Sequence, residues 1–583
     1  MKKLSVFLFL ILFSAAAFCG DYFIPCKKMP VAVGGWSVDS SGTMCASSKG
    51  NSVSGEYEIP ESGTYYVWLR SYSFSQNWRK FSVAVNGKNL GKAGDEAFPD
   101  SKGKKPRAKL LWTRLPKSIA LEQGKASICV TSETGYSRLS ALMLTTNKDF
   151  VPPDDNDALA AMGELVSTIK KEFAGLIKFK VELEKPMIAY KVNEPVVFTI
   201  QAFCNGKAVE SGFIKYHLRA DYGFDEEKIV PCDGKPLKVG VTLDKPGFVR
   251  LQAELLDSNK NATISDDGNR PVFTGGAGVE IDKIPSLPEP ADFDEFWARQ
   301  VAKLKAVPLQ PTLTSQGKSD DGKFEYFSVS APCPGASYKG ETPRPMTGIF
   351  SKPVGADPGT LKARLYLPGY GGRGGERTRC AASSGYIIMS INAHGMDIGR
   401  EREYYDKFEA SRAGYAMNDG ADPENCYFNG MVLRVLRALE FLRSLPEWNG
   451  IDLEVIGPSQ GGLQSLWAAG LDHTVSFCEA RIPWACNMGE TTLGLMGRDR
   501  VKIQYAPGRE YYDPVNFAKR IKCPVDIPRA SMGDYTSPPS GVARVYFNLQ
   551  CPKTITWVQN SEHVEGVPPD VERVRMSGDE IVK

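Results

Sequence analysis

The sequence predicts a multidomain protein, with two N-terminal β-sandwiches followed by a C-terminal α/β domain built on a doubly wound, mostly parallel sheet. Three observations predict this fold class. A chain of 583 residues is longer than one hydrophobic core usually supports. Up to about residue 284, short runs of alternating apolar and polar residues are separated by turn signals, as in half-buried strands. From residue 285 on, strand-like runs alternate with amphipathic helical runs, the order that builds a parallel sheet.

The composition is that of an ordinary globular protein, with 42% hydrophobic and 24% charged residues. The formal net charge is +3, and no long run of one sign occurs. We therefore expect no nucleic acid and no membrane among its partners. The sequence is compatible with a homo-oligomer.

Residues 1–20 have the pattern of a secretory signal peptide. Lys2 and Lys3 precede an unbroken apolar run over residues 6–13, and small residues follow at 14–17. This run is too short for a spanning helix, which needs about 20 apolar residues. We expect a secreted or periplasmic protein. Lipoprotein anchoring through Cys19 is the weaker alternative, because Phe18 stands where a small residue is wanted.

The cysteines fit export but match no metal motif. Of 13 cysteines, twelve remain after Cys19 is removed, and an even number is compatible with disulfides in an oxidising compartment. Cys204 and Cys232 are the only two in their stretch and form one candidate pair. The alternative is that most cysteines are small buried residues. We expect no metal and no organic cofactor.

Residues 21–152 are expected to form the first β-sandwich. Runs at 64–70 and 81–85 are rich in β-branched and aromatic residues, and Asn86-Gly87 follows as a hairpin turn. The region resembles the galactose-binding-like modules of secreted carbohydrate enzymes, which implies a glycan ligand stacked on exposed aromatic rings. Core packing is the preferred alternative for any one ring. Four tryptophans are concentrated here, namely Trp36, Trp68, Trp78 and Trp112.

Residues 153–176 are expected to be a linker helix, because apolar residues recur at helical spacing over 158–173. Residues 177–284 are expected to form an immunoglobulin-like β-sandwich. Apolar residues alternate over 177–183 and, less cleanly, over 196–202 and 249–255. This stretch has no cluster of chemically reactive residues, so a structural or spacing role is its default interpretation.

Residues 285–583 are expected to form the α/β domain, with buried strands at 363–367, 386–391 and 453–456. The motif Gly457-Pro-Ser459-Gln-Gly461 lies between the last of these strands and a helix at 463–469. A Gly-x-Ser-x-Gly in this context is a nucleophile elbow, in which small residues permit a turn so tight that the serine is exposed. The alternative is a tight turn with a surface serine.

A serine hydroxyl needs a base, and the chain has four histidines: His217, His394, His473 and His563. In the α/β-hydrolase fold the chain order is serine, acid, histidine, so the base should come late. Only His563 meets this, because it follows a strand at 554–558. Asp534 opens the loop after the preceding strand and is the candidate acid. Asp526, inside that strand, is its rival.

These residues resemble the acetyl xylan esterase and cephalosporin C deacetylase family of the α/β-hydrolase superfamily. The resemblance covers about residues 286–583. It implies that Ser459 is the nucleophile, His563 the base and Asp534 its orienting acid. It also implies an oxyanion hole made by the backbone N–H groups of Tyr370 and Gln460, and short acyl groups on sugars such as xylose units. The supporting motifs are Gly457-Pro-Ser-Gln-Gly-Gly462, Gly533-Asp-Tyr-Thr-Ser-Pro-Pro539 and Glu562-His563.

Two motifs depart from the family. His394-Gly395-Met396 stands where the family usually has Arg-Gly-Gln, which puts substrate preference in question more than catalysis. Pro368-Gly369 replaces the His-Gly that often precedes the oxyanion tyrosine. The backbone N–H donor survives this second change, because it belongs to the next residue.

The sequence therefore predicts a secreted serine carboxylic-ester hydrolase that removes acetyl groups from xylan or related polysaccharides and oligosaccharides. One alternative is a secreted prolyl-oligopeptidase-type peptidase, but no repeat of 40–50 residues indicates the propeller of that class. The other is a non-catalytic carbohydrate-binding protein. The expected partners are an acetylated carbohydrate substrate and a glycan at the N-terminal sandwich.

Overall fold

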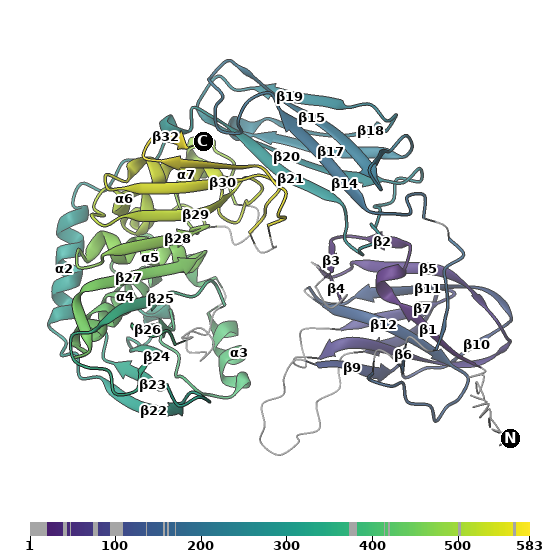
Figure 1. The fold of residues 1–583 in the computed structure, drawn as a ribbon, viewed down its shortest axis with the longest axis horizontal. Helices are drawn as coiled ribbons and strands as arrows, with labels where there is room; N and C mark the ends of the chain where they lie inside the picture. Colours follow the sequence, from purple (N-terminus) through teal and green to yellow (C-terminus); the bar gives the residue numbers. More distant parts are fainter. Residues whose placement is uncertain are drawn as a thin grey trace, which may run out of the picture.

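The computed structural model arranges the chain as an arch of three bodies (Figure 1). The first β-rich region and the C-terminal domain form its two sides, and the second β-rich region joins them at the top. The predicted signal peptide lies outside the described residues, apart from Gly20. The structure describes residues 20–38, 43–46, 48–73, 80–93, 109–135, 137–155, 158–159, 162–169, 171–371, 382–412, 414–417, 420–498, 503–563 and 567–582.

The first β-rich region contains two mainly antiparallel sheets around a shared hydrophobic core. One sheet has the order β10-β6-β12-β1-β13, with β9 on β6 and the pair β3–β4 on β12, and the other has the order β2-β5-β11-β7-β8. The strands are β1 (Asp21–Pro25), β2 (Val31–Val33), β3 (Trp36–Val38), β4 (Met44–Ala46), β5 (Ser52–Ile59), β6 (Gly63–Ser73), β7 (Phe81–Val85), β8 (Lys88–Ala93), β9 (Lys109–Arg114), β10 (Ile119–Leu121), β11 (Gly124–Ser132), β12 (Arg138–Thr145) and β13 (Gly163–Glu164).

Two of the four tryptophans in this region are engaged within the protein. Trp36 is 6% exposed and belongs to the core. The indole N–H of Trp112 donates to the Pro153 carbonyl oxygen at 3.0 Å, and the guanidinium of Arg70 lies 5.8 Å from its ring centre. Trp78 lies outside the described residues. Glycan binding by this region stays a prediction.

The linker helix predicted over 158–173 is confirmed only at Ala158 and Leu159 and does not continue through the other described residues of this stretch. Gly163 and Glu164 form β13, which pairs with β1, and the N–H of Leu165 donates to the Phe23 carbonyl oxygen at 2.9 Å. Leu165 enters the core, whereas Val166 is 73% exposed, so the apolar residues do not share one face. Pairing with the first region overrides the helical periodicity, which is a weak local preference.

The second β-rich region contains two antiparallel sheets with their own core. Their orders are β14-β15-β16, with β19 also on β15, and β18-β17-β20-β21. The candidate disulfide between Cys204 and Cys232 is not formed, because both are free thiols, as are the other described cysteines. The strands are β14 (Ile177–Leu183), β15 (Pro195–Cys204), β16 (Lys207–Ala208), β17 (Phe213–Ala220), β18 (Asp225–Pro231), β19 (Leu237–Thr242), β20 (Gly247–Leu256) and β21 (Val272–Val279).

The C-terminal domain is built on a mixed sheet of eleven described strands in the order β22-β23-β24-β26-β25-β27-β28-β29-β30-β31-β32. The central strands from β26 to β30 are parallel, but both ends of the sheet are antiparallel. The sheet is therefore mixed, and the predicted parallel strands form its centre. Short hairpin connections join β22 to β23 and β31 to β32, and such connections give antiparallel pairs. The strands are β22 (Thr312–Lys318), β23 (Phe324–Ala331), β24 (Met346–Pro353), β25 (Leu361–Tyr366), β26 (Tyr386–Ile391), β27 (Trp448–Pro458), β28 (Phe477–Arg481), β29 (Val525–Ser531), β30 (Lys553–Val558), β31 (Arg573–Ser577) and β32 (Glu580–Val582).

The helices of this domain complete the largest hydrophobic core. The described ones are α2 (Phe293–Lys305), α3 (Arg402–Ser411), α4 (Tyr427–Ser444), α5 (Gln460–Leu471), α6 (Pro514–Ala518) and α7 (Pro539–Asn548). Helix α4 is almost wholly buried, and α5 packs on β27 and β28. No helix in the described part of the chain has the length and apolar character to cross a bilayer.

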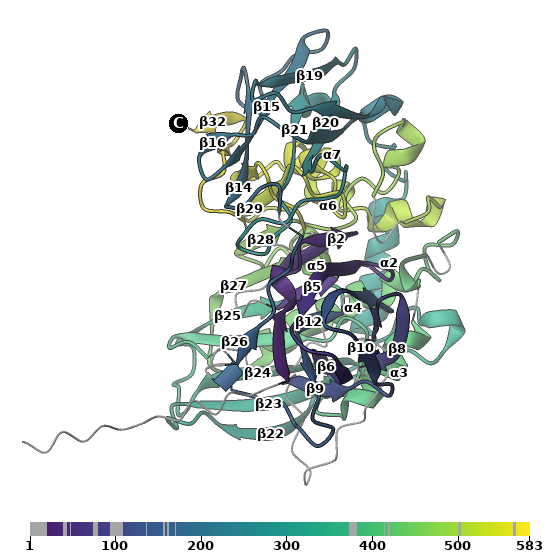
Figure 2. The same cartoon turned by 90° about the vertical axis from the view of Figure 1, so that its right-hand side faces the viewer.

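The second β-rich region docks on the C-terminal domain through one edge. Strands β20 and β21 lie beside β30 and α7 in the first view, and the turned view again places them next to α7 (Figures 1 and 2). This contact brings the second region close to the loops that follow β29 and β30.

Candidate active site

Ser459 lies in the tight turn between β27 and α5, as the elbow motif predicts. Its backbone has φ +56° and ψ −120°, a strained conformation for a residue with a side chain. A Cβ atom added at Gly461 would lie 1.9 Å from the Leu367 carbonyl oxygen, and one at Gly457 would lie 2.4 Å from the same atom. Neither position has room for a side chain. The turn therefore requires both glycines of the motif.

The structure brings the three predicted triad residues together from separate loops. His563, between β30 and β31, has its Nε2 atom 2.8 Å from the Ser459 Oγ atom. Its Nδ1 atom lies 2.7 Å from Asp534 Oδ2. Asp534 lies between β29 and α7. This geometry lets His563 take the serine proton while the carboxylate accepts the N–H at Nδ1.

The carboxylate of Asp534 is held on both oxygens. Its side chain has no solvent exposure, and Oδ1 accepts the backbone N–H groups of Thr536 and Ser537, each at 2.9 Å. Oδ2 is left to face His563. The side chain of His563 is 13% exposed. An oriented, buried acid beside a slightly exposed imidazole suits a base that acts on an incoming substrate.

The rival candidates lie elsewhere. Asp526 accepts a hydrogen bond from the Thr554 hydroxyl on the neighbouring strand. His217 is on β17 of the second β-rich region, where its Nε2 atom lies 2.8 Å from Asp225 Oδ1. Both side chains bond to residues of neighbouring strands, and neither contacts Ser459.

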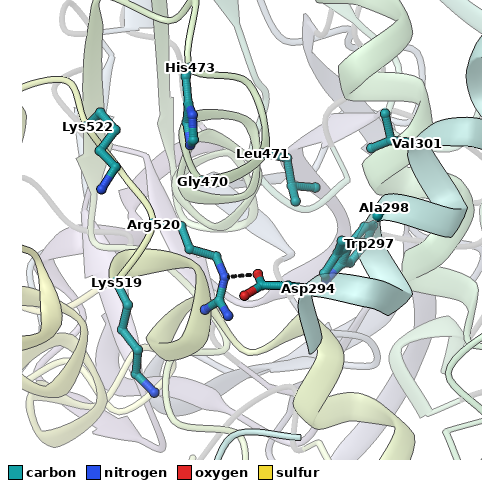
Figure 3. Close-up of a pocket in the computed structure, with 10 residues that line it drawn as sticks. All are labelled: Asp294, Trp297, Ala298, Val301, Gly470, Leu471, His473, Lys519, Arg520 and Lys522. Carbon is teal, nitrogen blue, oxygen red and sulfur yellow. Dashed lines mark hydrogen bonds and ion pairs between the residues drawn. The ribbon is translucent and has the colours of Figure 1, made fainter. Parts of the chain in front are cut away.

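His473 follows α5 at the end away from Ser459. A helix of 12 residues spans about 18 Å, which separates this histidine from the nucleophile. It lines a surface pocket of about 440 Å³ between α2, the end of α5 and the residues that follow α6 (Figure 3). The cation nearest the middle of this pocket, Arg520, is paired with Asp294. His473 is therefore not a candidate base.

The predicted oxyanion residues flank Ser459. Gln460 is the first residue of α5, and the first N–H groups of a helix have no partner within it. Gly369 precedes Tyr370 in a loop next to the elbow, since a Cβ atom added at Gly369 would lie 3.8 Å from the Ser459 Cβ atom. Both residues therefore adjoin the turn that carries Ser459, and their role as oxyanion donors stays a prediction.

A group of aromatic rings supports this side of the site, and it was not found in the sequence. The Tyr415 hydroxyl donates to the side-chain oxygen of Gln460. The Tyr415 ring stacks on Tyr370, with ring centres 5.7 Å apart and an angle of 14°. Tyr415 lies in a short 3₁₀ turn (Tyr415–Met417), so no motif or periodicity marked it.

His394, the departure from the family's Arg-Gly-Gln, belongs to the same group. Its ring meets Tyr415 edge-on at 4.8 Å, and its Nδ1 atom lies 2.9 Å from the Tyr427 hydroxyl. Burial and then the nearby Arg434 guanidinium lower the pKa of His394 to about 3. The imidazole is therefore neutral at ordinary pH and packs as a flat ring behind Tyr415. It supports the site without contacting Ser459.

Comparisons with known proteins match this part of the chain. Residues 282–494 match the acetyl xylan esterase (AXE1) family. This match includes Tyr370, Ser459 and Gln460, and it ends before Asp534 and His563. The acetyl esterase Axe7A of Xylanibacter ruminicola is 28% identical over 391 residues, which cover 64% of this chain and 84% of that protein.

Two solved structures are also similar. Acetyl xylan esterase from Paenibacillus sp. R4 is 24% identical and aligns with 50% of this chain and 94% of its own, at a TM-score of 0.42. Acetyl xylan esterase 1 from Thermoanaerobacterium sp. JW/SL YS485 is 20% identical, with 49% and 93% covered and a TM-score of 0.39.

Proposed function

The C-terminal part of this chain belongs to the acetyl xylan esterase family of carboxylic ester hydrolases, and we propose that the protein is a secreted serine esterase that removes acetyl groups from xylan or related polysaccharides and oligosaccharides. The observation that carries this proposal is the hydrogen-bonded chain Ser459–His563–Asp534 at the carboxyl ends of parallel strands. A degenerate, purely carbohydrate-binding domain would have no reason to keep this chain of contacts.

The proposed reaction proceeds through an acetyl-enzyme. Ser459 Oγ attacks the ester carbonyl carbon while its proton passes to His563 Nε2. The negative oxygen that forms is stabilised by the backbone N–H groups of Tyr370 and Gln460. When the ester C–O bond breaks, His563 gives the proton to the departing sugar oxygen, which leaves as a hydroxyl group. Water then attacks the acetyl-serine while His563 takes one of its protons, and His563 passes that proton to Ser459 Oγ as the acyl–serine bond breaks and acetate is released.

The exposed ring of Tyr370 supports a sugar as the alcohol part of the ester. Tyr370 is 55% exposed although it borders the elbow, and one face of its ring is stacked on Tyr415. An aromatic ring offers a sugar an apolar face to pack on, with the hydroxyl groups left in water. Tyr415 would hold that ring in place while a sugar binds.

The test compares purified natural protein with Ser459→Ala on p-nitrophenyl acetate, acetylated xylan and a prolyl peptide substrate. We expect hydrolysis of both esters and none of the peptide, with a loss on the order of 10³-fold or more in Ser459→Ala. Retention of more than about a tenth of the natural turnover in the variant would rule out Ser459 as the nucleophile. Cleavage of the peptide instead would favour the peptidase alternative.

The inactive Ser459→Ala protein also tests the proposed glycan contact of the first β-rich region. This variant should sediment with insoluble acetylated xylan, and because it lacks the proposed nucleophile, the polymer keeps its acetyl groups during the experiment. Equal sedimentation with an unrelated insoluble polymer would show that no specific glycan contact exists.

A further inference from the structure

The second β-rich region touches the two loops that carry the acid and the base of the proposed triad. We call residues 532–537 the acid loop, because they contain Asp534, and residues 559–563 the base loop, because they contain His563. Both loops leave the ends of neighbouring parallel strands, β29 and β30. Both are covered on one side by the edge formed by β20 and β21.

The base loop is bonded to the backbone of β21 through two of its side chains. The side-chain amide of Gln559 donates to the Gly276 carbonyl oxygen and accepts the Gly276 N–H, both at 2.8 Å. The next side chain, Asn560, accepts the N–H of Thr274 at 3.1 Å. Gln559 is 5% exposed, so these bonds are made away from water. Three residues after Asn560, the same loop presents His563.

The acid loop is held from the same side by Arg250 of β20. The Arg250 guanidinium donates to the Gly533 carbonyl oxygen at 3.3 Å and lies 4.3 Å from the ring centre of Tyr535. These two residues directly precede and follow Asp534. Gly533 is pressed against β21, since an added Cβ atom would lie 2.1 Å from the Thr274 side chain. Arg250 itself is 4% exposed.

The two loops are also tied to each other. The Gly533 N–H donates to the Ser561 carbonyl oxygen at 3.0 Å, and the hydroxyl group of Ser531, the last residue of β29 before the acid loop, lies 2.8 Å from that of Ser561. A shift of either loop would therefore move the other. Because the contacts of Asp534 and Ser459 with His563 are single hydrogen bonds of 2.7 and 2.8 Å, they depend on both loops staying in place.

We propose that Arg250 and the β20–β21 edge are positioning elements for the Asp534–His563 pair, so that the second β-rich region is part of the catalytic scaffold. This inference rests on the proposed function, because it assigns the region a task only if the triad is the site of reaction. A spacer would need neither a buried cation against the acid loop nor a buried amide paired with the base loop.

The test uses full-length protein and p-nitrophenyl acetate, with kcat and KM measured separately beside the melting temperature. Arg250→Met keeps the volume of the side chain but removes its donors. We expect kcat to fall about 10- to 100-fold, the cost of misplacing catalytic groups by about 1 Å, with KM within about twofold. Arg250→Lys keeps a charged donor and should recover most of the lost kcat. Gln559→Leu should lower kcat in the same way through the base loop.

Arg270→Met is the matched control. Arg270 belongs to the same region and is ion-paired with Glu254, but its other bond goes to the Gly34 carbonyl oxygen of the first region. It should lose stability to a similar degree and keep its kcat.

Ser459→Ala in the same assay separates the two ideas. If it retains activity, the proposed function is wrong and the positioning role falls with it. A different result is that Ser459→Ala is inactive but Arg250→Met and Gln559→Leu keep kcat within about threefold of the natural protein, well short of the expected loss. The proposed function then stands and the positioning role is refuted. The role is also refuted if Arg270→Met loses as much kcat as Arg250→Met, or if kcat falls only in proportion to the folded fraction.

Discussion

Replacing Asp534 with Asn tests how the buried carboxylate orients His563. The new side chain has one oxygen and one NH₂ group, and the two backbone N–H groups of Thr536 and Ser537 already occupy the Oδ1 position. The amide oxygen should take that position, which turns the NH₂ group toward His563 Nδ1. Nδ1 must then accept, so the imidazole proton moves to Nε2 and faces Ser459 Oγ. A base with its proton on Nε2 cannot take the serine proton.

The magnitude follows from the same contacts. The productive orientation of the amide would give up two buried hydrogen bonds at about 1 to 1.5 kcal/mol each, so it is disfavoured by about 2 to 3 kcal/mol. That alone lowers the competent fraction roughly 30- to 150-fold, taking 1.4 kcal/mol for each tenfold change. The lost negative charge adds to this, and a total loss in kcat on the order of 10⁴-fold is typical of this change in a Ser-His-Asp triad.

The assay is steady-state hydrolysis of p-nitrophenyl acetate by Asp534→Asn, with Asp526→Asn as the matched control and a thermal melt of each protein. Asp526 bonds only to Thr554 among the contacts described above, so its variant should keep natural kcat. If Asp534→Asn stays within tenfold of the natural protein, the tautomer argument fails. If Asp526→Asn is the damaged variant, the acid has been assigned to the wrong residue.

Three further predictions concern a glycine of the turn, a hydroxyl group beside it and two buried carboxyl groups. Gly461→Ala should lower both melting temperature and kcat, because the new Cβ would lie 1.9 Å from the Leu367 carbonyl oxygen; natural values of both would contradict the steric argument. Tyr415→Phe removes the hydroxyl that donates to Gln460, and kcat should fall about fivefold to tenfold, the worth of about one neutral hydrogen bond, with KM unchanged. An unaltered kcat would show that Gln460 needs no such support. Burial raises the pKa of Asp221 and Glu490 to about 7, so the folded chain binds these protons more tightly than the unfolded chain does. The stabilisation that these two protonated carboxyls provide is complete at low pH and is lost as pH rises from about 4 to about 7. The melting temperature should therefore decrease between pH 5 and pH 8, and it should decrease less steeply in Asp221→Asn. Equal slopes of melting temperature against pH in the two proteins would refute this prediction.

Much of the C-terminal domain could be predicted because its signals are local. The strands expected at 386–391 and 554–558 and the helix expected at 463–469 are confirmed by β26, β30 and α5. Burial on both faces makes such strands continuously apolar, and this can be read from neighbouring residues alone. The antiparallel ends of the sheet were missed, since local apolarity carries no information on strand direction.

The linker helix, which is helical only at Ala158 and Leu159 among the described residues, was otherwise mispredicted for the opposite reason. Its helical spacing is a genuine local pattern, but its backbone groups find partners in β1 and β5 instead, as the bonds of Leu165 to Phe23 and of Thr168 to Glu56 show. Isolated helices of this length are marginal in water, so tertiary pairing decides the outcome.

The sequence by itself determined the tight turn at Ser459 and the chain order of the proposed triad residues, because the turn needs glycines at fixed spacing and the α/β-hydrolase fold predicts the order of serine, acid and base. Only the tertiary structure decided which distant residues hold these loops in position. Arg250 and Gly533 are 283 residues apart, as are Gly276 and Gln559. No local pattern encodes such pairs, because each residue is an ordinary strand or loop residue until the chain has closed.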